Sequence, residues 1–309
     1  MTRKLPELLC LLVLILELGT AAAQQTSQPE QNPIPASNPQ ESAGTPDAVA
    51  LARQMANANN PLADMNALQF QNYFTPTFYG VSNVTSNVMN LRGVLVSGRM
   101  IFRATLPIST VPAGGRVVDV PEEGEIPELT PSVGSVQYAS GLGDLIAFLT
   151  IRLTASDAAT AFAIGPMVVA PTATDKALGS GKWQAGAAGV VVHPLQGGNL
   201  LAALITWQHS FAGQQDRPST NVSIVQPIGI FQIGGGYYVR SSSVILLDLQ
   251  NGRYLVPFGL GVGRVFRVGK AISNIWVEPQ PTIYHNKPGL PAFQLFMGIN
   301  FQWAKRAKK

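Results

Sequence analysis

The chain has 309 residues, of which 46% are hydrophobic and only 12% are charged, whereas a soluble domain usually has roughly 25% charged residues. This composition argues against a water-soluble protein, and no mature stretch reaches the roughly 18 consecutive apolar residues of a transmembrane helix. The net charge of +4 equals the charge of Lys305, Arg306, Lys308 and Lys309 near the C-terminus. The rest of the chain is neutral, so we exclude nucleic-acid binding and interpret the tail at residues 304–309 as a solvated basic segment.

Residues 1–23 have the features of a secretory signal peptide. Arg3 and Lys4 give a positive start, residues 8–16 are apolar, and the alanines at 21–23 offer a cleavage site. The only cysteine, Cys10, lies in this segment. The mature chain would therefore have no disulfide, no zinc–thiolate site and no cysteine nucleophile.

Residues 24–66 form a segment rich in Gln and Pro at its start, which we expect to be disordered or extended. Within it, residues 47–58 show helical spacing at Val49, Ala52 and Met55, with Asp47 as a candidate N-cap. This spacing predicts a short helix. We interpret it as a linker helix, with a periplasmic plug as the alternative.

From Leu68 onward the hydrophobic residues alternate, which is typical of β-strands because successive side chains point to opposite faces. The last segment is the clearest. One of its faces carries Phe293, Leu295, Met297, Ile299, Phe301 and Trp303, and the other carries Gln294, Gly298, Asn300 and Gln302, with Phe296 as the exception. One face suits lipid and the other suits water, so we expect the first five residues of the apolar face to be exposed in a belt. The ending Phe-x-Trp resembles the signal that the barrel-insertion machinery recognises.

The same alternation predicts twelve strands between residues 67 and 303. Their expected ranges are 68–79, 87–97, 100–109, 142–153, 161–170, 183–193, 200–211, 221–232, 237–249, 254–267, 275–284 and 292–303. Only a closed barrel satisfies all backbone groups of such strands in a bilayer, and bacterial barrels have an even strand number. The predicted fold class is therefore all-β, a transmembrane antiparallel up-and-down β-barrel. Short turns fall on its periplasmic side, and the long connections 110–141 and 171–182 fall on its external side.

Several segments also resemble a known family. They include NNPLADMNALQFQNYF from Asn59, GPMVVAPTATDKALGSGKWQAG from Gly165 and YLVPFGLGVGRVFRVGK from Tyr254. Together they are similar to outer-membrane proteins associated with the phenol-degradation meta pathway, which are also called "transporter" or "neuromedin U". The resemblance runs from about Asn59 to Trp303. It implies a β-barrel with a transport role and no catalytic residues.

Two glycine motifs are better explained by structure than by nucleotide binding. Gly259, Gly261 and Gly263 lack the G-x-G-x-x-G spacing, and glycines on one face of a strand make room in a lumen. The run from Gly179 to Lys182 looks like the end of a P-loop, but the earlier glycine is missing and Trp183 follows. We interpret this run as an external turn.

The three histidines, His193, His209 and His285, lie in separate segments without paired spacing, so no metal site is predicted. His209 and Ser210 are adjacent in a strand and would face opposite sides, which prevents a nucleophile–base pair between them. A serine on a neighbouring strand could still pair with His209, so an outer-membrane enzyme stays open as an alternative. No catalytic, cofactor-binding or metal-binding residue is predicted.

The charged residues opposite the apolar faces are the candidate site residues. We expect them, together with one aromatic residue, in the lumen or at its rims: Arg103, Asp144, Arg152, Arg240, Asp248, Arg267, Trp276 and Glu278. An arginine at the lipid midplane would cost about 2–4 kcal/mol. We expect Asp144 and Asp248 near the external end and Glu278 in contact with at least one interior arginine. Phe148, Tyr238 and Phe296 share the inner face. The network either braces the barrel or selects a solute.

The sequence therefore predicts a passive channel in the outer membrane for small solutes that are partly apolar or aromatic. The alternatives are a lipid-modifying enzyme and a structural or adhesive barrel without flux. The expected partners are the lipid bilayer, the insertion machinery through the last strand, and a solute that the sequence does not identify. No cofactor and no nucleic acid are expected.

Overall fold

The structure is a computed structural model that describes Met55 and residues 57–113, 116–120, 124–128, 137–155 and 158–304. The chain divides into two units, residues 1–44 and 45–309, and every described residue belongs to the second. The predicted signal peptide, most of the segment 24–66, most of the helix predicted at 47–58, and the tail beyond Ala304 lie outside the described residues. Within the described part, no helix combines the length and the apolar character needed to cross a membrane.

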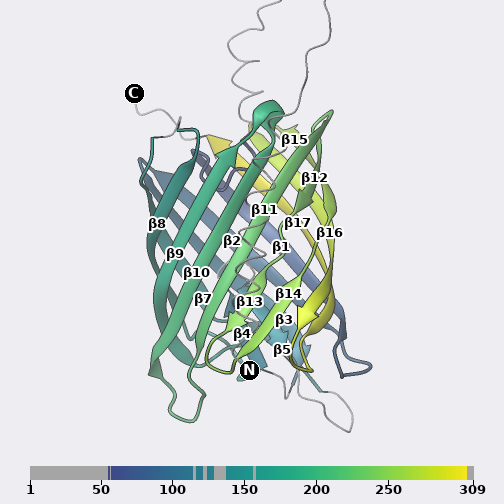
Figure 1. Ribbon diagram of the computed structural model, residues 1–309. Helices are drawn as coiled ribbons and strands as arrows, with labels where there is room; N and C mark the ends of the chain where they lie inside the picture. The colour runs from purple at the N-terminus through teal and green to yellow at the C-terminus, as the bar shows by residue number, and fades with distance from the viewer. Residues whose placement is uncertain are drawn as a thin grey trace, which may run out of the picture. The chain divides into compact units, whose positions relative to one another are not determined.

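The second unit is a closed antiparallel β-barrel of 12 strands (Figure 1). In chain order the strands are β1 (Met65–Phe78), β2 (Ser86–Ser97), β3 (Met100–Pro112), β6/β7 (Tyr138–Leu142 and Leu145–Arg152), β8 (Ala161–Ala170), β9 (Lys182–Pro194), β10 (Leu200–Gly213), β11 (Asn221–Gly234), β12/β13 (Tyr237–Ser241 and Ile245–Asp248), β14/β15 (Arg253–Pro257 and Gly261–Val268), β16 (Ala271–His285) and β17 (Pro291–Ala304). Each strand pairs with its neighbours in sequence, and β1 pairs with β17 to close the barrel. The predicted fold class is confirmed.

All twelve predicted strand ranges overlap an observed strand, but some ends were wrong. Strand β16 begins at Ala271 rather than at 275, and β3 continues to Pro112 because it pairs there with β6. Strands β4 (Arg116–Val120) and β5 (Gly124–Glu128) form a separate hairpin inside the long connection that was predicted to lack strands. Three barrel strands are interrupted, and the sequence did not predict these breaks.

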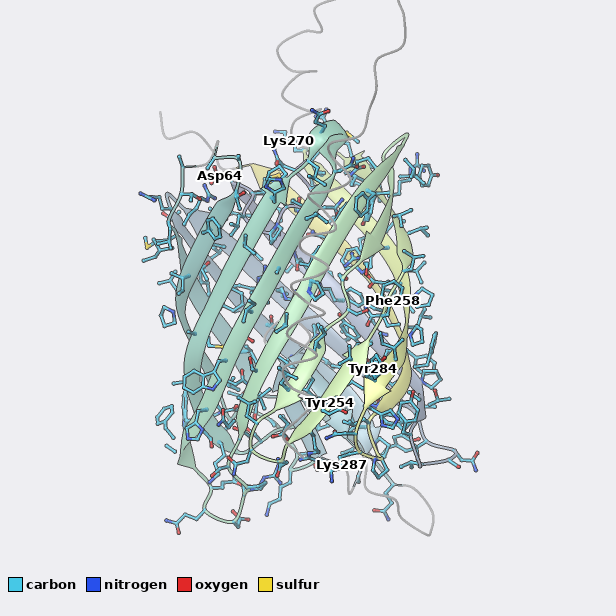
Figure 2. The ribbon with its side chains drawn as sticks, in the orientation of Figure 1. Asp64, Tyr254, Phe258, Lys270, Tyr284 and Lys287 are labelled. Carbon is cyan, nitrogen blue, oxygen red and sulfur yellow. The ribbon has the colours of Figure 1, made fainter. Side chains whose placement is uncertain are left out.

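The outer surface of the barrel is apolar, with large hydrophobic side chains around most of its circumference (Figure 2). Among the most exposed are Leu95, Leu153, Phe162, Phe211, Ile233, Leu260 and Ile283. The five belt residues predicted on β17 lie on this face but are half-buried, so their full exposure was wrong. Neighbouring β1 and β16 flank them on both sides, and large side chains of adjacent strands cover one another.

The two ends of the barrel differ. We call the end near Lys270 the short-turn end, because its connections are short, for example those at Gly98 and at Gly235–Gly236 (Figure 2). We call the end near Lys287 the long-loop end, because it has the long connections 113–137 and 171–181. The interior of the short-turn half is an apolar core that includes Val94, Val96, Ile101, Val190, Val192, Leu204, Ile230, Val265 and Ile272. The interior of the long-loop half is mixed: buried polar residues such as Gln184, Gln208 and Gln280 lie there beside two smaller apolar clusters, one around Leu246 and one around Ile146.

A turn before β1 packs into the apolar core and forms what we call the floor segment, residues 57–64. Ala58 and Leu62 on this segment are only 2% and 5% exposed. Gln302 donates a hydrogen bond to the Ala58 carbonyl (2.8 Å), and Arg152 donates one to the Leu62 carbonyl (2.8 Å). The floor segment therefore lies inside the barrel at its short-turn end.

Candidate functional site

Three glycines on the inner face of β14/β15 leave a trough in the barrel wall, here the glycine trough: Gly259, Gly261 and Gly263. A Cβ atom at any of them would lie closer than 3.0 Å to a neighbouring atom, on Glu278 for Gly259 and Gly261 and on Tyr238 for Gly263. Side chains of β12 can therefore reach side chains of β16, although β14/β15 lies between these two strands. This geometry agrees with the interpretation that the three glycines make room inside the barrel.

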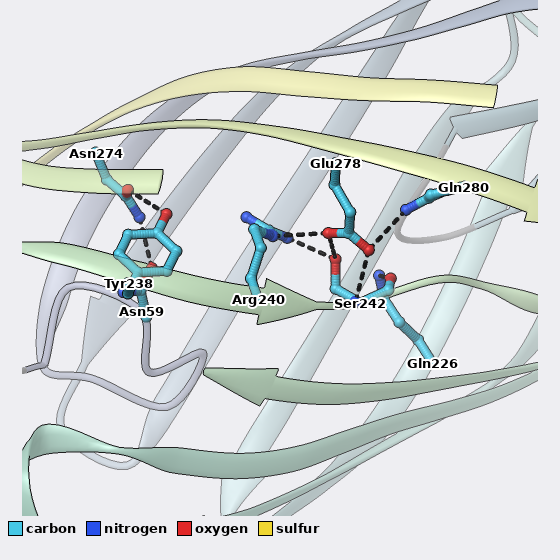
Figure 3. Close-up of polar contacts among 8 residues, drawn as sticks. All are labelled: Asn59, Gln226, Tyr238, Arg240, Ser242, Asn274, Glu278 and Gln280. Atoms are coloured by element: carbon cyan, nitrogen blue, oxygen red, sulfur yellow. Dashed lines mark hydrogen bonds and ion pairs between the residues drawn. The ribbon is translucent and has the colours of Figure 1, made fainter. Parts of the chain in front are cut away.

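Across the trough, Glu278 of β16 forms a cluster with Arg240, Ser242 and Gln280, here the carboxylate node (Figure 3). Arg240 Nε lies 2.8 Å from Glu278 Oε2, and the Ser242 hydroxyl donates to the same oxygen at 2.8 Å. The other oxygen, Oε1, accepts from the Ser242 backbone N–H (2.8 Å) and from Gln280 Nε2 (3.0 Å). Glu278 is 0% exposed. A buried carboxylate is stable only when it is paired and hydrogen-bonded, and these contacts meet that requirement.

The carboxylate node lies where the backbone ladder is interrupted. Between β12/β13 and β14/β15 the pairing ends at Arg240–Gly261 and resumes at Leu246–Leu255. The Ser242 N–H donates to Glu278, and the Ser242 carbonyl accepts from Gln226 Nε2 (2.8 Å). Unpaired backbone groups are costly in a wall that faces hydrocarbon. Side chains thus replace ladder hydrogen bonds at Ser242.

An aromatic cluster adjoins the carboxylate node and consists of Tyr73, Trp276 and Phe296, from β1, β16 and β17. The rings of Tyr73 and Phe296 stack with centroids 4.3 Å apart, and Trp276 meets Phe296 edge-on at 5.6 Å. The Arg240 guanidinium lies 4.7 Å from the centre of the Trp276 ring and 5.1 Å from that of Phe296. Arg240 therefore makes both an ion pair and cation–π contacts.

The structure brings Arg240, Trp276 and Glu278 together and places the other interior arginines elsewhere. Arg103 is buried, with its guanidinium 5.0 Å from the centre of the Phe148 ring. Arg152 is buried too and pairs with Asp64 of the floor segment at 3.1 Å. The predicted contact of Glu278 with an interior arginine is made with Arg240. A role of these residues in selecting a solute stays a prediction.

The remaining three candidates lie toward the ends of the barrel. Asp248 pairs with Arg253 at 3.0 Å beside the turn at 249–252 of the long-loop end. Arg267 is exposed at the short-turn end, where its Nε donates to the Gly269 carbonyl (2.7 Å). Asp144 lies between β6 and β7 at the long-loop end.

Asp144 holds the connection 171–181 in place. Its carboxylate accepts from the backbone N–H groups of Ala173 (3.0 Å) and Ser180 (2.8 Å) and from the Ser180 hydroxyl (2.9 Å). Burial raises the pKa of Asp144 above its usual value, while these hydrogen bonds and the nearby Arg217 oppose the rise. Arg217 donates to the carbonyls of Ser180, Lys176 and Gly179. The Gly179–Lys182 motif thus belongs to a turn of the long-loop end.

One interior arginine, Arg92, and the floor segment were not predicted from the sequence. Arg92 is buried and donates from Nε to the Thr105 hydroxyl at 3.0 Å. It shares its face with Val94 and Val96, which lie in the interior core rather than toward lipid. A pattern that assigns every apolar face to the outside therefore misses Arg92. Within the described ranges, no group of three or more His, Cys, Asp or Glu residues could hold a metal ion.

Substitution of Gly261 tests the trough. A Cβ atom there would meet the Val277 carbonyl oxygen and the Glu278 Cα, which are backbone atoms. We expect Gly261→Val to destabilise the barrel by about 1–3 kcal/mol, as overpacking does. The matched control is Gly93→Val, because Gly93 has nothing within 4 Å of its Cβ position. The measurement is the temperature at which each variant loses its folded mobility on a gel, and equal temperatures for both variants would contradict the tight trough.

Comparisons with known proteins show the fold. No family model and no curated protein matches the chain. Among solved structures, the chain is similar to an outer membrane channel from Pseudomonas putida F1, with a TM-score of 0.54 and 14% identity over 77% of this chain and 94% of that one. Two mutants of the Rh. blastica porin also match, at 12% and 13% identity over 77% of this chain and 99% of theirs, but their TM-scores of 0.22 and 0.21 are too low to support an argument. The chain therefore shares the β-barrel fold of the Pseudomonas channel.

Proposed function

We propose that the protein is an outer-membrane channel that passes small, partly apolar solutes. The observation that carries this proposal is the inverted distribution of side chains: large hydrophobic residues face outward around most of a closed barrel, while Glu278 and Gln280 are buried inside and the Arg240 side chain is only 11% exposed. Soluble monomers seldom expose such large apolar patches, and membrane barrels have this arrangement. Short turns usually face the periplasm, so we assign the short-turn end to that side.

The interior supports a solute of mixed character. A solute that crosses the barrel from the long-loop end would pass polar residues and two apolar clusters, then the carboxylate node with the aromatic cluster, and then the apolar core that contacts the floor segment. A barrel of 12 strands is also narrower than the porins of 16–18 strands, which favours small solutes. The C-terminal strand β17 closes the barrel against β1, and we propose that the insertion machinery recognises this strand.

The enzyme alternative depended on a serine of a neighbouring strand beside His209, and the residues directly opposite His209 are Asn221 of β11 and Ala185 of β9. The adjacent Ser210 was excluded by strand parity. Ser210 is buried and its hydroxyl donates to the Thr220 carbonyl, whereas His209 is exposed on the outside of the same strand. Their opposite orientation is the one that strand geometry requires.

Reconstitution tests the channel function. We expect measurable ion conductance in planar bilayers and faster uptake into proteoliposomes of benzoate, an anion with an apolar body, than of the polar anion malate. Liposomes without protein, which both anions cross slowly at neutral pH, are the control. Absence of conductance together with absence of uptake of either anion would contradict the proposal.

A further inference from the structure

The outward face of the barrel carries one charged side chain within the strands that the structure describes. Every other Asp, Glu, Lys or Arg of these barrel strands lies at an inward position, by the alternation of side chains along its strand. Arg264 of β15 is the exception, because it continues the outward row of Phe258, Leu260 and Val262. An arginine on a lipid-facing surface is costly away from the headgroups. Its presence there therefore points to a partner outside the chain.

The charge of Arg264 is not balanced on this face. Its guanidinium forms no hydrogen bond or ion pair with any residue that the structure describes, and it lies 4.8 Å from the centre of the Tyr237 ring. Its neighbours across the strands are Tyr237 of β12 and Ile275 of β16, and Val262 and Phe266 flank it along β15. None of these four side chains is negatively charged. The exposed guanidinium thus has donors for an anion from outside the chain.

Arg264 lies toward the short-turn end of the barrel. Strand β15 turns back into β16 at Gly269 and Lys270, and two outward residues, Phe266 and Val268, separate Arg264 from this turn (Figure 2). Tyrosine, here Tyr237, is typical of the level at which a membrane meets water. A long arginine side chain can extend from such a position to the lipid headgroups. The anion within its reach is therefore a headgroup phosphate.

We propose that Arg264, held by the Tyr237 ring, binds the phosphate of an anionic phospholipid in the leaflet at the short-turn end. A guanidinium donates two parallel hydrogen bonds to phosphate oxygens, and the cation–π contact with the ring orients it. The acyl chains lie against outward residues such as Val262 and Ile275, which are 54% and 42% exposed. An anionic headgroup is preferred to a zwitterionic one, because no ammonium group of the lipid balances its phosphate. The site requires a bilayer around the barrel but no passage of solute.

The test is native mass spectrometry of the full chain in detergent, titrated with phosphatidylglycerol or with phosphatidylcholine of the same acyl chains. We expect the protein to retain one phosphatidylglycerol at concentrations at which phosphatidylcholine is not retained. Arg264→Gln should weaken the retention of phosphatidylglycerol about tenfold, the effect of a hydrogen bond to a charged group. The matched control is Lys270→Gln, which removes the same charge from the turn of the same hairpin and should keep the retention.

A second pair of variants checks the positioning role of Tyr237. Tyr237→Leu removes the ring and should weaken the retention about threefold, whereas Tyr237→Phe keeps the ring and the retention. Equal retention of both lipids, an equal loss in Arg264→Gln and Lys270→Gln, or release of the lipid by inorganic phosphate at the same concentration would overturn the inference. So would a dimer that Arg264→Gln dissociates while the retention of lipid is unchanged, because the partner would then be a second copy of the chain. The measurement needs no flux, so it is independent of the channel test.

Discussion

Glu278→Gln is expected to destabilise the barrel more than any other single substitution in the carboxylate node, by about 3–5 kcal/mol, the usual effect of breaking a buried ion pair. The Arg240 side chain is 11% exposed and that of Glu278 is 0% exposed, so water can replace little of the interaction that the remaining arginine loses. The interior would also lose one negative charge. We therefore expect the reversal potential of the channel under a salt gradient to shift toward anion selectivity, together with a lower unfolding temperature.

Two control variants separate the ion pair from other effects. Arg240→Gln combined with Glu278→Gln leaves no buried unpaired charge and should recover part of the lost stability. Asp64→Asn removes the partner of Arg152, but the Asp64 side chain is 55% exposed, so its loss should change stability by only about 0–1 kcal/mol. If Glu278→Gln unfolds at the wild-type temperature, the buried ion pair does not stabilise the barrel.

Leu62→Asp is expected to release the floor segment and raise the single-channel conductance severalfold. Leu62 is 5% exposed within the apolar core, and an unpaired carboxylate placed there would cost several kcal/mol. The wall strands are held by their own ladders, whereas the floor segment is held by a few hydrogen bonds, including those from Arg152 and Gln302. Displacement of the floor segment therefore costs less free energy than unfolding of the wall when the aspartate is introduced.

Leu62→Met is the matched control, because a swap of similar volume should leave the floor segment in place and the conductance unchanged. Arg152→Gln provides a second route, since it removes the ion pair to Asp64 and weakens the bond to the Leu62 carbonyl. We expect an intermediate rise in conductance for this variant. Wild-type conductance in a folded Leu62→Asp protein would show that residues 57–64 do not obstruct the lumen.

The strands could be predicted because the outward face carries a regular signal. In the segment that forms β17, for example, each apolar outward residue from Phe293 to Trp303 alternates with an inward residue. The break at 242–244 could not be predicted in this way. It depends on Glu278 and Gln226 replacing ladder bonds from other strands, and periodicity along one strand contains no information about such partners.

The inward position of the charged residues could be predicted from parity, whereas that of the interior apolar residues could not. Parity placed Arg240 and Glu278 on the inner face, and the structure joins them at 2.8 Å. It also placed Arg103 and Arg152 inward, and both are buried. In the short-turn half both faces of a strand are apolar, with Val94 and Val96 inside and Leu95 outside on β2. An apolar side chain does not mark the outer face there, because the floor segment supplies an apolar partner inside the barrel.

The hydrogen bonds of the floor segment also constrain the order of assembly. Asn274 of β16 donates to the Asn59 side chain, and Gln302 of β17 donates to the Ala58 carbonyl, across 215 and 244 residues of chain. Such distant contacts form late, because the chain entropy lost in joining them is large. Docking of the floor segment must therefore await the arrival of the last two strands. A nascent molecule would stay unobstructed at its short-turn end until β17 has sealed against β1.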